Sequence, residues 1–124
     1  MQHLYAFADE SDLYELEEHL VGAFAAFASS WSGEGVELVN RKAPLMDEQD
    51  IPDWNIGLFA DPSNLSRMQV EELLAFLLEL SRDVSLPFVV GISRYPHSPR
   101  ALCLIDRHIP DGAGGTILEG VNAV

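Results

Sequence analysis

The chain of 124 residues has little cysteine, few basic residues and no long uninterrupted apolar run. Its single cysteine, Cys103, excludes an internal disulfide framework and is typical of a protein in a reducing compartment. No apolar stretch has the length and purity of a membrane span, and residues 1–20 hold six acidic residues without any Lys or Arg, which does not resemble a signal peptide. We therefore expect a cytoplasmic protein without a membrane segment.

Basic residues are scarce in a very uneven way. Lys and Arg number 7 against 20 Asp and Glu, which gives a formal net charge of −13, and the first 40 residues contain no Lys or Arg. Residues 1–62 contain 13 acidic and 2 basic residues, whereas residues 63–124 contain 7 and 5. Because phosphate contacts need Lys and Arg, this charge argues against direct binding of nucleic acid or an anionic membrane. It favours a basic protein partner; the alternative is that the acidity only keeps the protein soluble.

An apolar content of 48% predicts a folded core, and the length fits a single acidic domain over residues 1–124. Periodicity predicts a first helix, capped by Asp9 or Ser11, with an apolar stripe of Leu13, Leu16, Leu20, Phe24, Phe27 and Trp31. A second helix is predicted to begin at a capping box of Ser66 and Gln69, with an apolar stripe of Val70, Leu73, Leu74, Leu77, Leu80 and Val84. Strands are predicted at residues 3–8, 36–40, 54–60, 88–92 and 101–105, and the third of them alternates, with Trp54, Ile56, Leu58 and Ala60 on one face.

The resulting order, βαββαββ, predicts an α+β fold of two layers. Two helices would cover one face of a mostly antiparallel sheet, in a broadly ferredoxin-like arrangement. Residues 41–53 are expected to form a surface loop, and the chain from residue 110 onward a loose C-terminus.

Residues with catalytic or ligand-binding chemistry occur only in weak patterns. Asp106 and His108 would share a strand face as a carboxylate-oriented general base, or form a surface ion pair. Cys103 lies in an apolar run, which indicates a buried structural thiol. The glycine-rich segment 112–116 follows a strand, as phosphate-binding loops do, but it lacks a lysine and is expected to be a turn. The His spacing matches no zinc site and the acidic spacing no EF-hand, so we expect neither a metal nor a cofactor.

The segment 46–54 has the composition of a protein interface. It places four carboxylates beside apolar side chains, and interfaces favour an aromatic anchor within a rim of complementary charge. The alternative is that its tryptophan opens a strand and packs in the core while the carboxylates are simply solvated. We expect the acidic surface to extend onto the first helix. The predicted partner-binding residues are Asp47, Glu48, Asp50, Asp53, Trp54, Tyr14, Glu15, Glu17 and Glu18.

These observations predict a non-enzymatic protein-binding module. Its most concrete form is a bacterial immunity-type inhibitor that neutralises a basic toxin or nuclease. Three alternatives stay open. The carboxylates would imitate nucleic-acid phosphates in the channel of a DNA- or RNA-binding protein, or Asp106 and His108 would serve a small general acid–base enzyme. In the third, an uncovered sheet face, with Val89 and Leu102 on it, would form a homodimer or larger oligomer.

Overall fold

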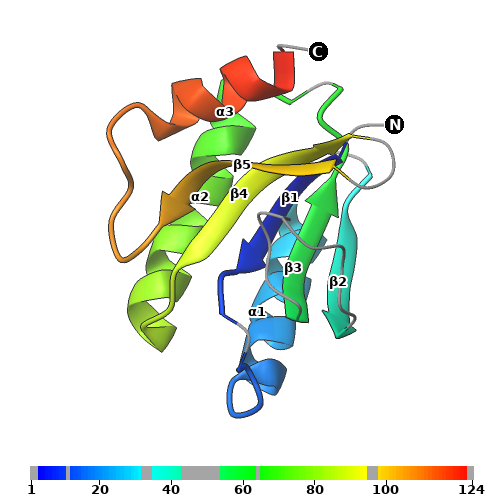
Figure 1. Ribbon diagram of the computed structural model, residues 1–124, viewed down its shortest axis with the longest axis vertical. Helices are drawn as coiled ribbons and strands as arrows, with labels where there is room; N and C mark the ends of the chain where they lie inside the picture. The colour runs from blue at the N-terminus through cyan, green and yellow to red at the C-terminus, as the bar shows by residue number, and fades with distance from the viewer. Residues whose placement is uncertain are drawn as a thin grey trace.

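The structure is a computed structural model that describes residues 3–10, 12–31, 35–42, 54–63, 65–94 and 98–122. These residues form five strands and three helices (Figure 1). The strands are β1 (His3–Ala8), β2 (Glu37–Lys42), β3 (Trp54–Ala60), β4 (Phe88–Arg94) and β5 (Ser98–Ile105). The helices are α1 (Glu17–Ser30), α2 (Arg67–Val84) and α3 (Ala113–Asn122).

All five strands join one antiparallel sheet in the order β2-β3-β1-β4-β5. Helices α1 and α2 lie behind this sheet in Figure 1, and α3 contacts α2, β4 and β5. The predicted α+β class and the antiparallel sheet are therefore confirmed. The five predicted strands are present, but their order in the sheet does not confirm the ferredoxin-like arrangement, and a third helix is added to the two that were predicted.

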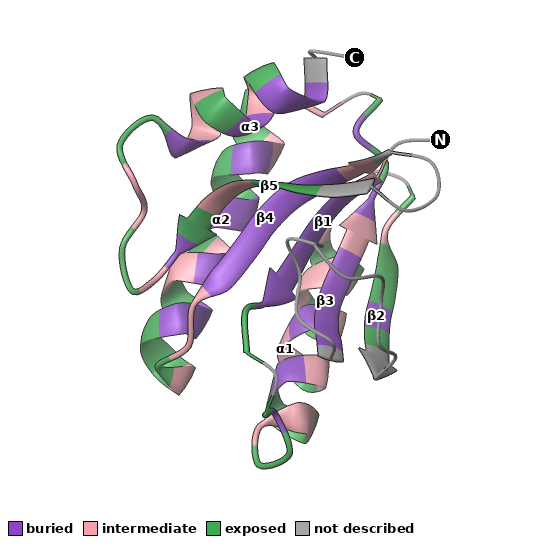
Figure 2. Cartoon of the chain, viewed as in Figure 1, coloured by how far each residue is buried: buried purple, intermediate pink, exposed green. Residues whose placement is uncertain are grey.

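The central strand β1 is buried on both of its faces (Figure 2). Leu4, Ala6 and Ala8 join the core beneath the helices, as alternation along a strand requires. The intervening Tyr5 and Phe7 belong to a second apolar cluster on the opposite face, with ring centroids 5.1 Å apart. This second cluster also contains Val39, Val89 and Phe59.

Helix α2 begins and packs as predicted. The Ser66 side chain accepts a hydrogen bond from the Gln69 main-chain N–H at 3.1 Å, and the Gln69 side chain accepts one from the Ser66 N–H at 2.9 Å. This capping box satisfies two N–H groups that the first turn leaves without helical partners. Most of the predicted apolar stripe is buried, namely Val70, Leu73, Leu74, Leu77 and Leu80, and its last residue, Val84, is half-buried.

The prediction for the start of α1 was wrong, because neither Asp9 nor Ser11 caps the helix. The N-cap is Leu16, which has no capping side chain, and Ser11 lies outside the described residues. Leu13 is completely buried, and its carbonyl accepts a hydrogen bond from the Leu16 N–H at 3.0 Å. The chain therefore makes one turn at Leu13–Leu16, with Leu13 buried, before the regular helix begins at Glu17.

The first two residues of the loop expected at 41–53 belong to a strand instead. Arg41 and Lys42 belong to β2, where they pair with Asn55 and Trp54 of β3, and residues 43–53 lie outside the described part of the chain. Main-chain hydrogen bonds to a neighbouring strand hold these residues in β2, and such bonds do not depend on apolar side chains. The polar sequence therefore gave no sign of the strand. Strands β4 and β5 are likewise longer than predicted, since they extend to Arg94 and begin at Ser98.

The C-terminal segment is a helix, which corrects the expected loose C-terminus from residue 110. Ala113, Ile117 and Val121 of α3, each four residues apart, are at least nine-tenths buried. Burying this stripe stabilises the helix despite Gly114 and Gly115, which disfavour helix by about 1 kcal/mol each. Among the described helices, none is long and apolar enough to cross a bilayer.

Candidate functional site

Of the predicted interface segment 46–54, only Trp54 belongs to the described residues. Asp47, Glu48, Asp50 and Asp53 lie outside the described residues. Trp54 is the first residue of β3, and its main chain pairs with Lys42, while its side chain is also outside the description. The proposed aromatic anchor in this segment therefore stays a prediction.

The other predicted residues, Tyr14, Glu15, Glu17 and Glu18, lie at one end of the molecule together with three further carboxylates. We call this region the acidic end and define it by six residues of the β1–α1 connection and the first turn of α1: Asp9, Glu10, Asp12, Glu15, Glu17 and Glu18. This connection forms the lower end of the molecule in Figure 1. Tyr14 lies within it and is 70% exposed. Tyr14, Glu15 and Glu18 are exposed, whereas Glu17 is half-buried and accepts a hydrogen bond from the Asn40 side chain at 2.8 Å.

Most carboxylates of the acidic end are not neutralised by a basic side chain in the described part of the chain. Among the described residues, no ion pair joins Asp9, Asp12, Glu15, Glu17 or Glu18 to a lysine or arginine. Glu17 and Glu18 lie at the N-terminus of α1, where the helix dipole favours carboxylates. Partial burial, followed by repulsion from Glu10, raises the pKa of Asp9 above its ordinary value. The end is thus a concentrated field of negative charge around an exposed aromatic ring.

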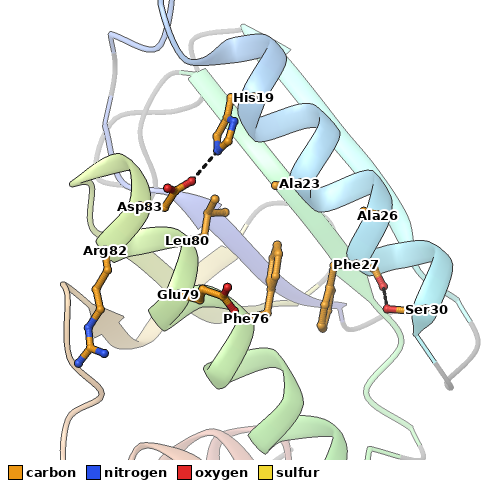
Figure 3. A pocket seen from close by; sticks show the side chains of 10 residues that line it. All are labelled: His19, Ala23, Ala26, Phe27, Ser30, Phe76, Glu79, Leu80, Arg82 and Asp83. Carbon is orange, nitrogen blue, oxygen red and sulfur yellow. Dashed lines mark hydrogen bonds and ion pairs between the residues drawn. The ribbon is translucent and has the colours of Figure 1, made fainter.

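A groove between α1 and α2 is a second candidate site, and the sequence interpretation missed it (Figure 3). The volume of this open groove is about 780 Å³. The rings of Phe27 and Phe76 stack at its centre, with centroids 4.3 Å apart and planes inclined by 13°. At one end His19 Nε2 contacts Asp83 Oδ2 at 2.9 Å and so joins the two helices. The remaining lining side chains are Ala23, Ala26, Ser30, Glu79, Leu80 and Arg82.

The Asp106–His108 pair does not form the arrangement of a carboxylate-oriented base. Both residues follow β5 instead of lying on it, and the His108 ring contacts the Asp106 main-chain carbonyl, with 3.1 Å from Nδ1 to the oxygen. The Asp106 carboxylate instead accepts a hydrogen bond from Arg107 Nη1 at 2.6 Å. The His108 ring is exposed, so nothing holds it in a desolvated site.

The other chemical candidates have structural roles. Cys103 lies in β5, and burial raises its thiol pKa to about 11, which suppresses the nucleophilic thiolate. The segment 112–116 opens α3, where Gly112 has a φ of +74° and its carbonyl accepts from the Thr116 N–H at 2.9 Å. No group of three His, Cys, Asp or Glu side chains in the described segments is arranged to hold a metal.

The sheet residues expected on an open face are not exposed. Val89 is 3% exposed within the second apolar cluster. Leu102 is half-buried, and its side chain fills the space beside Gly120 of α3. The exposed apolar side chains on the edge strands are instead Leu38 of β2 and Leu104 of β5, which are 43% and 44% exposed.

No protein-family model, curated protein or solved structure matches this chain. Evidence for function therefore comes from the acidic end and the groove. Both lie along α1, since His19 of the groove directly follows Glu18 of the acidic end.

Proposed function

We propose that the protein is a non-catalytic binding module that docks a basic protein against its acidic end. In its concrete form it is an immunity-type inhibitor that covers the cationic surface of a toxin or nuclease. The observation that carries the proposal is the gathering of carboxylates beside the exposed Tyr14, of which Asp9, Asp12, Glu15, Glu17 and Glu18 form no ion pair with a lysine or arginine among the described residues.

The composition of the acidic end fits a protein partner. Tyrosine is enriched among the side chains that contribute most to binding, and a charged rim around it directs the partner and fixes its orientation. Because no lysine or arginine in the described segments pairs with Asp12, Glu15 or Glu18, their field acts on the approaching partner. We expect association to be fast and to slow with added salt, since exposed charges are screened over about 8 Å at physiological ionic strength.

An acid–base enzyme has less support. Its proposed pair, Asp106 and His108, is joined through a main-chain carbonyl, and neither residue lines the groove between α1 and α2. A binding module needs no such constellation. The acidic end is therefore the surface that the proposal assigns to function.

The test compares two variants with equal net charge. The first carries Asp12→Asn, Glu15→Gln and Glu18→Gln in the acidic end. The control carries Glu72→Gln, Asp111→Asn and Glu119→Gln, which are exposed residues of α2, the loop before α3, and α3. Each variant removes three negative charges from the total of −13.

The wild-type chain is first used to capture and identify a partner from cells of its native host at low salt. Association rates of the purified partner are then measured with both variants at several salt concentrations. We expect the acidic-end variant to associate at least about tenfold more slowly than the control at low salt, and the two rates to converge at high salt. Equal rates for the two variants at low salt would show that the acidic end is not the docking surface.

A further inference from the structure

The exposed surface of α1 beyond its first turn carries no charge. From Leu20 to Ser30 the helix contains only apolar residues, glycine, alanine and serine. Gly22, Ala26, Ser29 and Ser30 are exposed within this stretch. In a chain with 22% charged residues, eleven consecutive uncharged residues on a partly exposed helix form an unusual surface.

The groove beside this surface has an aromatic floor. Phe27 and Phe76 are half-buried, so the stacked pair is in part open to water. Ala23 and Ala26 on the α1 side are too small to cover these rings, and the space above the rings is the groove. An apolar side chain that entered here would gain about 25 cal/mol for each Å² of apolar surface that it removed from water.

The groove is lined by two acidic residues, one arginine and one histidine. Glu79 and Asp83 of α2 line it together with His19, which pairs with Asp83. Arg82 extends away from the phenylalanine pair in Figure 3, and its Nε donates a hydrogen bond to the Arg107 carbonyl at 3.1 Å. The groove therefore presents carboxylates beside an apolar floor, which complements a ligand that carries positive charge beside an apolar face.

The shape of the groove suits a helical segment of a protein better than a small molecule. Most of its lining residues are exposed, so it is an open channel along two helices and not an enclosed cavity. The 14 residues of α1 span about 21 Å, which matches a helix of about four turns lying alongside. An amphipathic helix that lays its apolar face in a groove is a common mode of peptide recognition.

We infer that the groove between α1 and α2 receives a basic amphipathic helix of the same partner that docks on the acidic end. Apolar side chains of that helix would lie over Phe27 and Phe76, and its lysines or arginines would lie near Glu79, Asp83 and the acidic end. This inference rests on the proposed function, and it adds the secondary structure and the apolar character of the bound segment.

The test uses a dye-labelled helical probe peptide of Leu and Lys with the same number of residues as α1, with Leu at the a and d positions of the heptad. A peptide of identical composition with scrambled Leu positions controls for attraction to a chain of net charge −13. Affinities are measured by fluorescence anisotropy at about 0.15 M salt, and again at a lower and a higher salt concentration. The blocking variant is Ala26→Gln, and the matched control is Ala75→Gln, since Ala75 is an exposed residue of α2 that does not line the groove.

We expect the amphipathic probe to bind the wild-type chain at least about tenfold more tightly than the scrambled probe. Ala26→Gln should weaken this binding at least about fivefold and Ala75→Gln less than about twofold, at low and high salt alike, because the added side chain acts by occupying space. Melting curves of both variants verify the fold. Equal affinities for the two probes, or for the two variants, would overturn the inference.

The captured partner separates this inference from the proposed function. If the acidic-end variant slows its association but Ala26→Gln behaves like Ala75→Gln, the groove inference is wrong and the proposed function stands. If only Ala26→Gln weakens the complex, the groove binds the partner and the acidic end does not. If sedimentation shows that the wild-type chain self-associates and that Ala26→Gln makes it monomeric, the occupant is a second copy of the chain and the inference is wrong.

Discussion

Ser81 connects the C-terminal end of α2 to two segments that follow it in the sequence. Its side chain is fully buried, and its Oγ donates a hydrogen bond to the Leu86 carbonyl at 2.6 Å. The same oxygen accepts a hydrogen bond from the Arg107 N–H at 2.8 Å. The hydroxyl group thus joins the turn from α2 into β4 to the turn after β5, beside hydrogen bonds from Arg82 Nε to the Arg107 carbonyl and from Arg107 Nη2 to the Ser85 carbonyl. Arg82 and Asp83, which line the groove, belong to this part of α2.

Ser81→Ala removes both hydrogen bonds without adding volume. A hydrogen bond contributes about 1 kcal/mol net, and a buried partner left without one costs about 1–3 kcal/mol. Leu86 is half-buried and Arg107 is exposed, so water compensates in part, and we assign about 2.5 kcal/mol to the two losses together. The higher helix propensity of alanine returns about 0.5 kcal/mol. The free energy of unfolding should therefore fall by about 2 kcal/mol.

Urea unfolding monitored by circular dichroism measures this change. With a slope of about 1.5 kcal/mol/M, the midpoint should fall by about 1.3 M. Ser29→Ala, at an exposed position of α1, is the matched control and should change the free energy by less than about 0.5 kcal/mol. A loss below about 0.5 kcal/mol for Ser81→Ala would show that the hydroxyl does not hold these turns together.

Three further changes test other parts of the structure. The raised pKa of Asp9 means that its carboxylate form destabilises the folded state, so Asp9→Asn should increase stability at pH 7. The gain should shrink as the pH falls through the raised pKa and vanish below 3.8; a constant or growing gain in urea titrations at low pH would contradict this. Because the pKa of Cys103 is raised to about 11, a thiol reagent at pH 8 should modify the folded chain roughly a hundredfold more slowly than the urea-unfolded chain, and equal rates would refute its burial. Gly91→Ala would place a methyl group against the Arg100 carbonyl and the Tyr5 ring and should cost about 2 kcal/mol, whereas Gly22→Ala on the exposed face of α1 should stabilise by up to about 1 kcal/mol; equal effects in thermal melts would contradict the packing at Gly91.

Elements with strong local signals were predictable from the sequence. The capping box at Ser66 and the stripe through Leu77 each involve residues a few positions apart, so no knowledge of distant segments is needed. The faces of β3 followed for the same reason, because Ile56, Leu58 and Ala60 alternate and all join the core.

Elements decided by distant contacts were not predictable. The β1–α1 connection carries residues suited to an N-cap, but burial of Leu13 delays the helix to Glu17. The segment from residue 110 contains four glycines, yet Ile117 and Val121 are buried in the core, and their helix contacts α2, β4 and β5. In both cases a few buried side chains outweigh local propensity.

The two parts of the candidate site differ in the same way. The acidic end was visible as a run of carboxylates around Tyr14, because residues close in sequence and before a helix also lie close in space. The groove depends on a meeting of Phe27 with Phe76, which are about fifty positions apart, and Phe27 was assigned to the core stripe of α1 with Phe24. Phe24 is indeed buried, but Phe27 is half-buried at the groove, and periodicity alone does not distinguish a core position from the wall of a groove.

The distribution of charge over the two helices argues against solubility as the whole explanation of the acidity. Charges that only keep a protein soluble need no particular order, and the exposed face of α2 shows such a mixture in Arg67, Glu71 and Glu72. In α1 the carboxylates stop at Glu18, and an uncharged, partly exposed surface follows up to Ser30. Phe27 and Phe76 are only half-buried beside this surface, and exposed apolar surface lowers solubility. The carboxylates at the acidic end are too far along the helix to compensate for this. An apolar strip next to a concentrated charged end is the separation found between the centre and the rim of an interface. This separation supports a binding surface along α1, with the acidic end attracting a cationic partner and the groove retaining it.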